Sequence, residues 1–146
     1  MPTEGQAALH QLDRVLASPG FARNERLSRF LRFVVERHLE GRDAELKESV
    51  LAIEVFGRPP DYDPKQDPIV RKEAGRLRVL LSEYYLSEGR SDSTVIELPK
   101  GGYVPVLRRA AVAGPGSPTP AGLPAPRRVW MVASVAALVV LGAAVE

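Results

Sequence analysis

The segment Asp67-Pro-Ile-Val-Arg-Lys-Glu-Ala-Gly-Arg-Leu-Arg-Val-Leu-Leu81 combines a helix start with a two-sided pattern of side chains. Asp67 is a residue type that caps helices, and Pro68 would occupy the first helical position, where proline is favourable. At about 100° per residue, the apolar side chains of this segment and of the turn after it fall along one line. They are Val70, Ala74, Leu77, Leu81 and Tyr84. The pattern predicts a helix over residues 67–85 that is buried along one side.

The other side of this predicted helix carries charge of one sign. An arc from about 80° to 240°, measured from Val70, holds the basic residues together with a glycine and a valine. Its members are Arg71, Lys72, Gly75, Arg76, Arg78 and Val79. Glu73 is the only acidic residue of the first three turns, and it lies outside the arc. Because a solvated helix face usually interleaves both signs, the arc favours contact with DNA over a solvated or protein-binding surface.

A hairpin is predicted after this helix. Two short β-type runs, residues 94–98 and 103–107, flank the turn Pro99-Lys100-Gly101-Gly102. Pro105 cannot donate a ladder hydrogen bond, so we expect its strand at an edge. Lys100 at the tip of the turn suits a wing that contacts a phosphate.

Three further helical patterns precede the basic helix. Residues 8–16 form an amphipathic stretch that Ser18-Pro19-Gly20 ends, and residues 27–39 form the strongest core helix, which closes at Gly41. Residues 46–56 form the third stretch, before a glycine and two prolines. The fold class that follows is mainly α with a small β-hairpin. Helices that end in a basic helix and are followed by a basic-tipped hairpin have the order of parts of a winged helix-turn-helix, here expected over residues 1–109.

The composition changes after this domain. Residues 110–126 are almost entirely Ala, Gly, Pro, Ser and Thr, which predicts a disordered proline-rich linker. Arg127 and Arg128 then precede the uncharged apolar run 129–145, which is long enough for roughly 25 Å of helix. We therefore expect residues 127–146 to form a transmembrane helix that contacts the lipid bilayer through 129–145.

Two interpretations of this apolar run stay open besides a buried soluble helix. It is either a C-terminal anchor completed by Glu146 or, as we favour, the first turns of a spanning helix whose remainder is missing. The cations near the run all lie on its N-terminal side, at Arg108, Arg109, Arg127 and Arg128. The positive-inside rule then predicts a single-pass protein of the inner membrane with its N-terminal domain in the cytoplasm.

The overall composition excludes several function classes. The chain has 146 residues, of which 45% are hydrophobic and 26% charged, as expected for a folded protein. Its formal net charge is only +2, so affinity for a polyanion must come from a local patch. It has no cysteine and two histidines, which argues against disulfides and metal sites. We predict no catalytic residues, no metal, no cofactor and no enzymatic activity.

The sequence also resembles a known family. Residues 67–81 and 95–106 are similar to the recognition helix and wing of the winged-helix output domains of OmpR-type response regulators, and of CadC/ToxR-like membrane-anchored regulators. A closer resemblance, over residues 8–108, is to the N-terminal domains of bacterial membrane sensor or adenylate-cyclase-labelled proteins. The segments that carry it are 27–36, Lys47-Glu48, 55–58 and Asp63-Pro64. The four-stranded N-terminal sheet of the response regulators has no counterpart here, and Leu80 stands where they often have a basic residue.

The resemblance implies that residues 67–85 are a recognition helix, with Arg71, Arg76 and Arg78 facing the major groove, and that residues 94–107 are the wing. The candidate DNA-binding residues are Arg71, Lys72, Gly75, Arg76, Arg78 and Lys100. We expect a membrane-tethered DNA-binding transcriptional regulator that acts in signal transduction. The alternative is a winged-helix module for protein interaction or dimerisation at the N-terminus of a membrane sensor or adenylate-cyclase-like protein, and a homodimer is left open as a partner in both cases.

Overall fold

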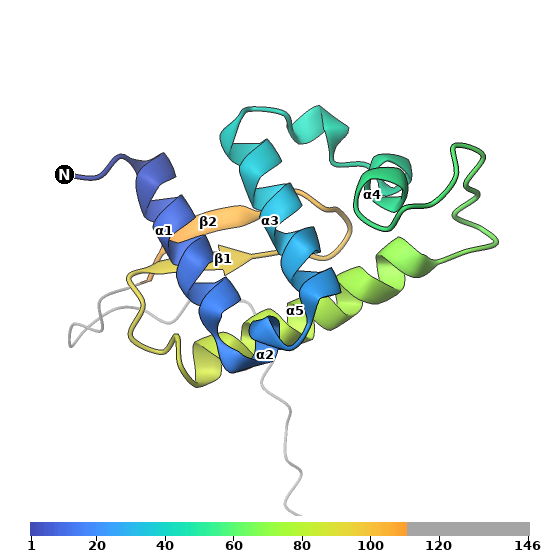
Figure 1. Ribbon diagram of the computed structural model, residues 1–146. Helices are drawn as coiled ribbons and strands as arrows, with labels where there is room; N and C mark the ends of the chain where they lie inside the picture. The colour runs from blue at the N-terminus through green and yellow to red at the C-terminus, as the bar shows by residue number, and fades with distance from the viewer. Residues whose placement is uncertain (111–146) are drawn as a thin grey trace, which may run out of the picture. The chain divides into compact units, whose positions relative to one another are not determined.

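The computed structural model describes residues 1–110 of the chain, and these form a helical domain with one hairpin (Figure 1). The elements in chain order are α1 (Glu4–Ala17), α2 (Pro19–Ala22), α3 (Glu25–Leu39), the 3₁₀ helix η1 (Asp43–Glu45), α4 (Glu48–Glu54), α5 (Ile69–Leu86), β1 (Thr94–Glu97) and β2 (Val106–Arg109). The prediction of a mainly α fold with a small hairpin is confirmed.

Two of the predicted segments lie outside the part of the chain that the structure describes. The linker predicted for 110–126, apart from Ala110, and the transmembrane helix predicted for 127–146 lie outside the described residues. Among residues 1–110, the structure contains no helix with the length and apolar character needed to cross a bilayer.

The N-terminal helices begin at side-chain caps. In α1, the Thr3 hydroxyl accepts from the backbone N–H of Gln6 at 3.3 Å, and the Gln6 side chain accepts from the Thr3 N–H at 2.9 Å. In α3, the Asn24 side chain accepts from the Leu27 N–H at 3.2 Å. The predicted stop of α1 is confirmed at Ser18, but Pro19 at once begins the short helix α2. The predicted end of α3 near Gly41 is also confirmed, with a positive φ of 73° at that glycine.

The helix predicted over residues 46–56 is present, but it is two residues shorter at each end. Only Glu48–Glu54 are α-helical, and η1 lies just before them. Leu46 and Lys47 leave the helical region, with ψ values of 63° and 152°. This break turns Leu46 into the core, where it is 6% exposed.

The helix predicted for 67–85 is present, but its N-cap and its first helical residue each lie one position later than predicted. Pro68 is the N-cap rather than the first helical residue, and α5 begins at Ile69. The Asp67 carboxylate still accepts from the Ile69 N–H at 3.2 Å and also from Arg58 Nε at 2.7 Å. The predicted buried stripe is confirmed, since all five of its apolar residues are buried. Glu73 is buried beside them.

The hairpin is confirmed, but its turn is longer than predicted. β1 and β2 are antiparallel, with Thr94 opposite Arg109 and Glu97 opposite Val106. The predicted strand 103–107 is therefore wrong at its start, because the ladder begins only after Pro105, which has no N–H to donate. Tyr103 instead packs toward the core, with its ring 6.5 Å from that of Phe30.

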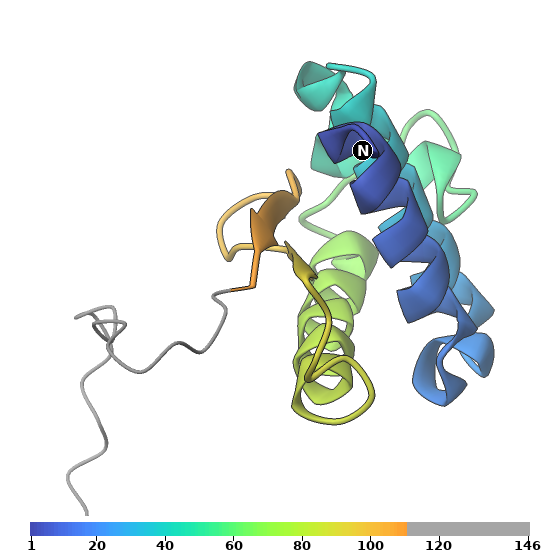
Figure 2. The ribbon, with the colours of Figure 1, turned by 90° about the vertical axis from the view of Figure 1, so that its left-hand side faces the viewer.

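The long helix α5 packs against α2, α3, α4 and β1, and β1 also packs directly against α1. Figure 2 shows the hairpin on one side of α5 and helices α1 and α2 on the other. The core fills the space between them, with Phe30, Val34 and Leu77 fully buried and Ile96 of β1 1% exposed. One side of α5 is therefore enclosed by the fold, as its apolar stripe requires.

A buried carboxylate links α1, α5 and the segment before β1. Asp92 is 4% exposed and accepts from the Tyr84 hydroxyl at 2.6 Å and from Gln11 Nε2 at 2.7 Å. Arg14 of α1 forms an ion pair with the same carboxylate. Next to it, the Tyr85 hydroxyl accepts from the backbone N–H of Ile96 at 2.8 Å. We call Gln11, Arg14, Tyr84, Tyr85 and Asp92 the Asp92 cluster.

The cluster changes the pKa values of its members in opposite directions. Burial by itself raises the pKa of Asp92, but hydrogen bonds from Gln11 and Tyr84 and the charge of Arg14 outweigh it and hold this pKa below its usual value. Burial, with the nearby Asp92 carboxylate, raises the pKa of Tyr84 to about 12. The cluster is therefore fully formed only when Asp92 is ionised and Tyr84 is neutral.

The first prediction concerns the variant Asp92→Asn. It should lower the free energy of unfolding at pH 7 by about 1–3 kcal/mol, because hydrogen bonds to a charged acceptor are lost. The folded-state pKa of Asp92 is below the unfolded value of about 4, so its stabilisation is present above that pH and is lost as the pH falls below it. Urea unfolding followed by circular dichroism between neutral and acid pH should therefore show a steeper acid loss in the parent than in the variant. Equal acid slopes, with equal stability at pH 7, would contradict the role given to Asp92.

Candidate nucleic-acid interface

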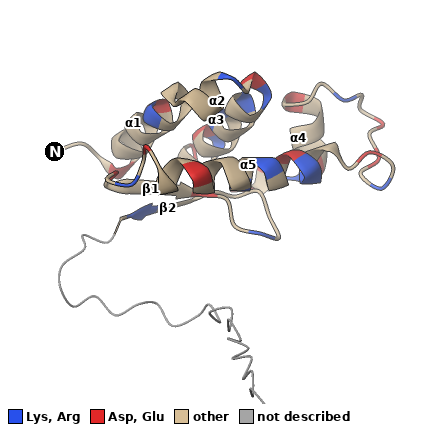
Figure 3. Cartoon of the chain, turned by 90° about the horizontal axis from the view of Figure 1, so that it is seen from below, with Lys and Arg blue, Asp and Glu red and all other residues tan. Residues whose placement is uncertain are grey.

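The outer side of α5 is open to solvent along its first half. Figure 3 shows that Lys and Arg gather on this part of the helix and that the hairpin turn also carries positive charge. Arg71, Lys72, Gly75, Arg76 and Val79 are all exposed, and we call them the α5 face. Five of the six predicted site residues thus lie on this face or beside it on α5, and Lys100 is exposed on the hairpin turn.

Arg71 joins the start of α5 to the preceding helix and loop. Its Nε lies 3.2 Å from Glu48 Oε1 of α4, and its Nη2 donates to the Pro64 carbonyl at 2.6 Å. The side chain is still 56% exposed. Arg71 therefore holds α4 and the loop before α5 together while part of its guanidinium faces solvent.

Arg76 lies over the buried carboxylate of α5. Its Nη1 donates to Glu73 Oε1 at 3.0 Å, and the Arg76 side chain remains 70% exposed. Arg26 of α3 approaches the same oxygen at 3.9 Å. Glu73 is thus an acidic partner that sits below the basic surface rather than on it.

Arg78 contacts the hairpin turn. Its Nε donates to the Leu98 carbonyl at 2.9 Å, and its Nη2 donates to the Pro99 and Gly102 carbonyls at 3.1 Å each. One guanidinium thus links α5 to both ends of the turn that carries Lys100. Arg78 lies at the junction of α5 and the hairpin, where it is half-buried.

Lys72, Gly75 and Lys100 are the least constrained of the candidates. Both lysines are exposed, and within residues 1–110 neither has an ion-pair partner within 4.0 Å. A Cβ placed on Gly75 would meet no atom within 4 Å, so nothing in the described fold requires a glycine there. The absence of a side chain lets another molecule approach the backbone of α5 at this point.

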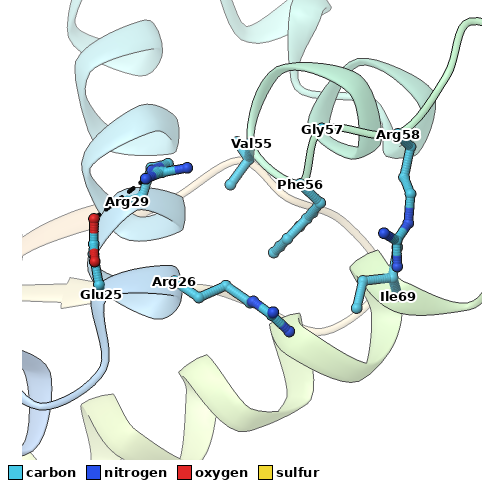
Figure 4. Close-up of a pocket in the computed structure, with 8 residues that line it drawn as sticks. All are labelled: Glu25, Arg26, Arg29, Val55, Phe56, Gly57, Arg58 and Ile69. Atoms are coloured by element: carbon cyan, nitrogen blue, oxygen red, sulfur yellow. Dashed lines mark hydrogen bonds and ion pairs between the residues drawn. The ribbon is translucent and has the colours of Figure 1, made fainter.

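Two hollows border α5. A shallow groove of about 520 Å³ lies between α2 and α5, lined by Gly20, Leu27, Gly75, Val79 and Leu80 among others. A second pocket, of about 440 Å³, lies between α3, the end of α4 and the start of α5 (Figure 4). Three arginines line it, namely Arg26, Arg29 and Arg58.

Tertiary structure adds residues to the interface that sequence reasoning missed. Arg26 and Glu48 lie far from α5 in the sequence, and no periodic pattern connects either of them to Arg71 or Arg76. Glu73 was placed outside the basic arc, but its burial under Arg76 was not expected. Counting these residues, six cations lie on or beside the α5 face and the hairpin turn, against the three carboxylates of Glu48, Glu73 and the exposed Glu83. The excess of positive charge is local, as the small net charge of the chain requires.

Comparison of the chain with family models, with curated proteins and with solved structures gives no match. Among the described residues, no group of three or more His, Cys, Asp and Glu side chains is placed to hold a metal ion.

The second prediction compares the effects of removing Arg78 and Lys72 on the stability of the domain. The variant Arg78→Ala should lower the free energy of unfolding by about 1–3 kcal/mol, because three backbone carbonyls lose a charged donor. It should also speed amide hydrogen exchange in residues 98–105. Lys72→Ala, the control on the same helix, should change stability by less than about 0.5 kcal/mol. Unchanged exchange in the hairpin turn of Arg78→Ala would show that the guanidinium does not hold the wing.

Proposed function

We propose that this chain is a membrane-tethered transcriptional regulator that binds duplex DNA through residues 67–85 and the wing, residues 94–107. The observation that carries the proposal is the pairing of an exposed basic helix face with a hairpin turn that also presents a lysine. The three hydrogen bonds of Arg78 hold these two parts together. The same arrangement, a winged helix-turn-helix, is the one that the sequence resemblance implies.

The dimensions of α5 support this proposal. A helix with its side chains is about 10–12 Å across, and the major groove of B-DNA is about 12 Å wide. α5 has 18 residues and leaves one side free of the fold. Gly75 and Val79 lie along the middle of that side, so the helix backbone and a small apolar side chain would approach the base edges. Lys72 and Arg76 lie beside them and would contact bases or phosphates.

The wing has a matching role. Lys100 stands between Pro99 and Gly102, whose carbonyls are both bound by Arg78. Its ammonium would therefore reach a phosphate next to the groove that α5 occupies. Phosphate contacts of this kind fix the orientation of a protein on DNA and carry no sequence information by themselves.

The membrane part of the proposal rests on the apolar run 129–145. A bilayer anchor there would hold the DNA-binding domain near the inner membrane, and the linker 110–126 would set its reach. The cations on the N-terminal side of the run favour a cytoplasmic position for residues 1–109.

One observation favours the alternative, a module that binds protein or a second copy of the chain. Val79 is 58% exposed and Leu86 is 76% exposed on the outer side of α5. Val79 also lines the groove between α2 and α5. An apolar helix face of this kind suits a partner helix, whereas the surrounding cations suit DNA.

The third prediction tests DNA binding. The full chain, kept in a non-ionic detergent, should bind a short mixed-sequence duplex with a steep salt dependence, because on the order of four or five counterions are released. Lys72→Ala and Lys100→Ala should each weaken binding to all sequences and lower the salt slope by about one. Fluorescence anisotropy at several salt concentrations measures both effects.

Arg32→Ala serves as the control, since Arg32 lies on α3 and pairs with Glu36 of the same helix. It should leave affinity and salt slope unchanged. A salt slope near zero for the parent chain would favour the protein-binding alternative.

The fourth prediction tests the anchor. A chain with a reporter after Glu146 should fractionate with the inner membrane, because residues 129–145 form an uncharged apolar run. The same reporter placed after Arg109 should be released to the soluble fraction. Recovery of the longer chain in the soluble fraction would rule out the membrane tether.

A further inference from the structure

The outer side of α5 has two different edges. The wing borders one edge, where Arg78 binds its carbonyls. The first turn of α3 borders the other edge, where Arg26 approaches Glu73 at 3.9 Å. Figure 3 shows α5 between the helices α2 and α3 on one side and the hairpin turn on the other.

Arg26 reaches this second edge from a separate helix. In Figure 4 its side chain extends from the start of α3 toward α5. It lines the pocket of about 440 Å³ beside α5, and 61% of the side chain is exposed. The guanidinium is therefore accessible while its helix is anchored in the core through Leu27 and Phe30, which are at most 2% exposed.

Arg26 is also free to change partners. Its contact with Glu73 is the longest ion pair among the described residues. Glu73 keeps a second partner, since Arg76 donates to the same oxygen at 3.0 Å. A buried carboxylate without a partner would be strongly destabilising, but here Arg26 can leave while the Glu73 charge stays paired. The other two arginines of the pocket are held more closely, Arg29 by Glu25 at 3.3 Å and Arg58 by Asp67 at 2.7 Å.

A major groove is bounded by two phosphate backbones, one from each strand. A helix that lies in the groove therefore has phosphates along both of its edges. Lys100 supplies a cation at the wing edge of α5. Arg26, with Arg76 beside it, supplies cations at the opposite edge.

We propose that Arg26 binds a backbone phosphate on the side of α5 opposite the wing, so that the first turn of α3 and the wing hold the two strands that border one major groove. This inference rests on the proposed function and extends it to a residue outside the helix and wing. Arg26 acts here as a phosphate-binding residue, and Glu73 holds Arg76 in place when Arg26 turns to the DNA.

The fifth prediction tests Arg26 with the full chain in non-ionic detergent and a duplex selected by that chain from random sequences. Arg26→Ala should weaken binding about tenfold, as expected for one charge-assisted contact, and should lower the salt slope by about one. Arg26→Lys should restore the slope, because a phosphate accepts a point charge. Arg32→Ala, on the same helix but paired with Glu36, should bind like the parent.

Phosphate ethylation interference locates the contact. Arg26→Ala should lose interference at a phosphate on one strand, and Lys100→Ala should lose it at a phosphate on the other strand across the same groove. Thermal unfolding of Arg26→Ala should match the parent, because Glu73 keeps Arg76 as its partner.

The outcomes separate the two proposals. If Lys72→Ala and Lys100→Ala weaken binding while Arg26→Ala leaves affinity and the ethylation pattern unchanged, the inference about Arg26 is overturned and the proposed function stands. If Arg26→Ala and Lys100→Ala lose phosphates on the same strand, the two-edge arrangement is wrong. If the parent chain selects no duplex, the proposed function fails and the inference fails with it.

Discussion

The carboxylate of Asp92 is the point on which the position of α5 depends. A buried charge is stable only when its hydrogen-bonding capacity is filled. Asp92 fills it with groups from two helices, Gln11 and Arg14 of α1 and Tyr84 of α5. Tyr85 then binds the backbone of β1 at Ile96. The polar cluster therefore connects the last turns of α5 to α1 and to the hairpin through directional hydrogen bonds.

The first half of α5 is held in a different way, by arginines that reach outward. Arg71 connects it to α4 and the loop before it, and Arg78 connects it to the wing. Each of these arginines uses part of its guanidinium for the fold and leaves part available. A guanidinium suits this use because its five donors lie in a fixed planar fork. The hairpin and the helix are thus joined by backbone acceptors that carry no net charge, and within residues 1–110 Arg78 has no ion-pair partner.

Much of the fold could be predicted because burial follows local periodicity. The stripe from Val70 to Tyr84 and the core side of α3 each recur at the helical period, so the pattern alone identified the buried face of both helices. The predictions that failed depended on distant contacts. The helix expected over 46–56 begins only at Glu48, after Leu46 has turned into the core, and the hairpin turn is longer because Tyr103 packs toward Phe30. In the candidate site, too, the features set by local periodicity could be predicted and those set by distant contacts could not. The exposed side of α5 was visible in the sequence, but the partners Glu48 and Arg26 were not, because tertiary structure alone brings them to α5.

The cations around α5 differ in how firmly the protein holds their side chains, and this difference affects how the surface would bind a polyanion. Arg71 and Arg78 are already ordered by contacts with the protein, so binding through them costs little side-chain entropy. The lysines at 72 and 100 have no ion-pair partner within residues 1–110, and each would lose rotamer freedom on binding. Lys100 is a partial exception, because Arg78 fixes the backbone on both sides of it and only its own side chain remains to be ordered. Ordered arginines favour one geometry of approach, while the free lysines adapt to whichever phosphate is near. A surface of this composition would hold a duplex in a defined orientation and still tolerate small differences in groove width from one sequence to another.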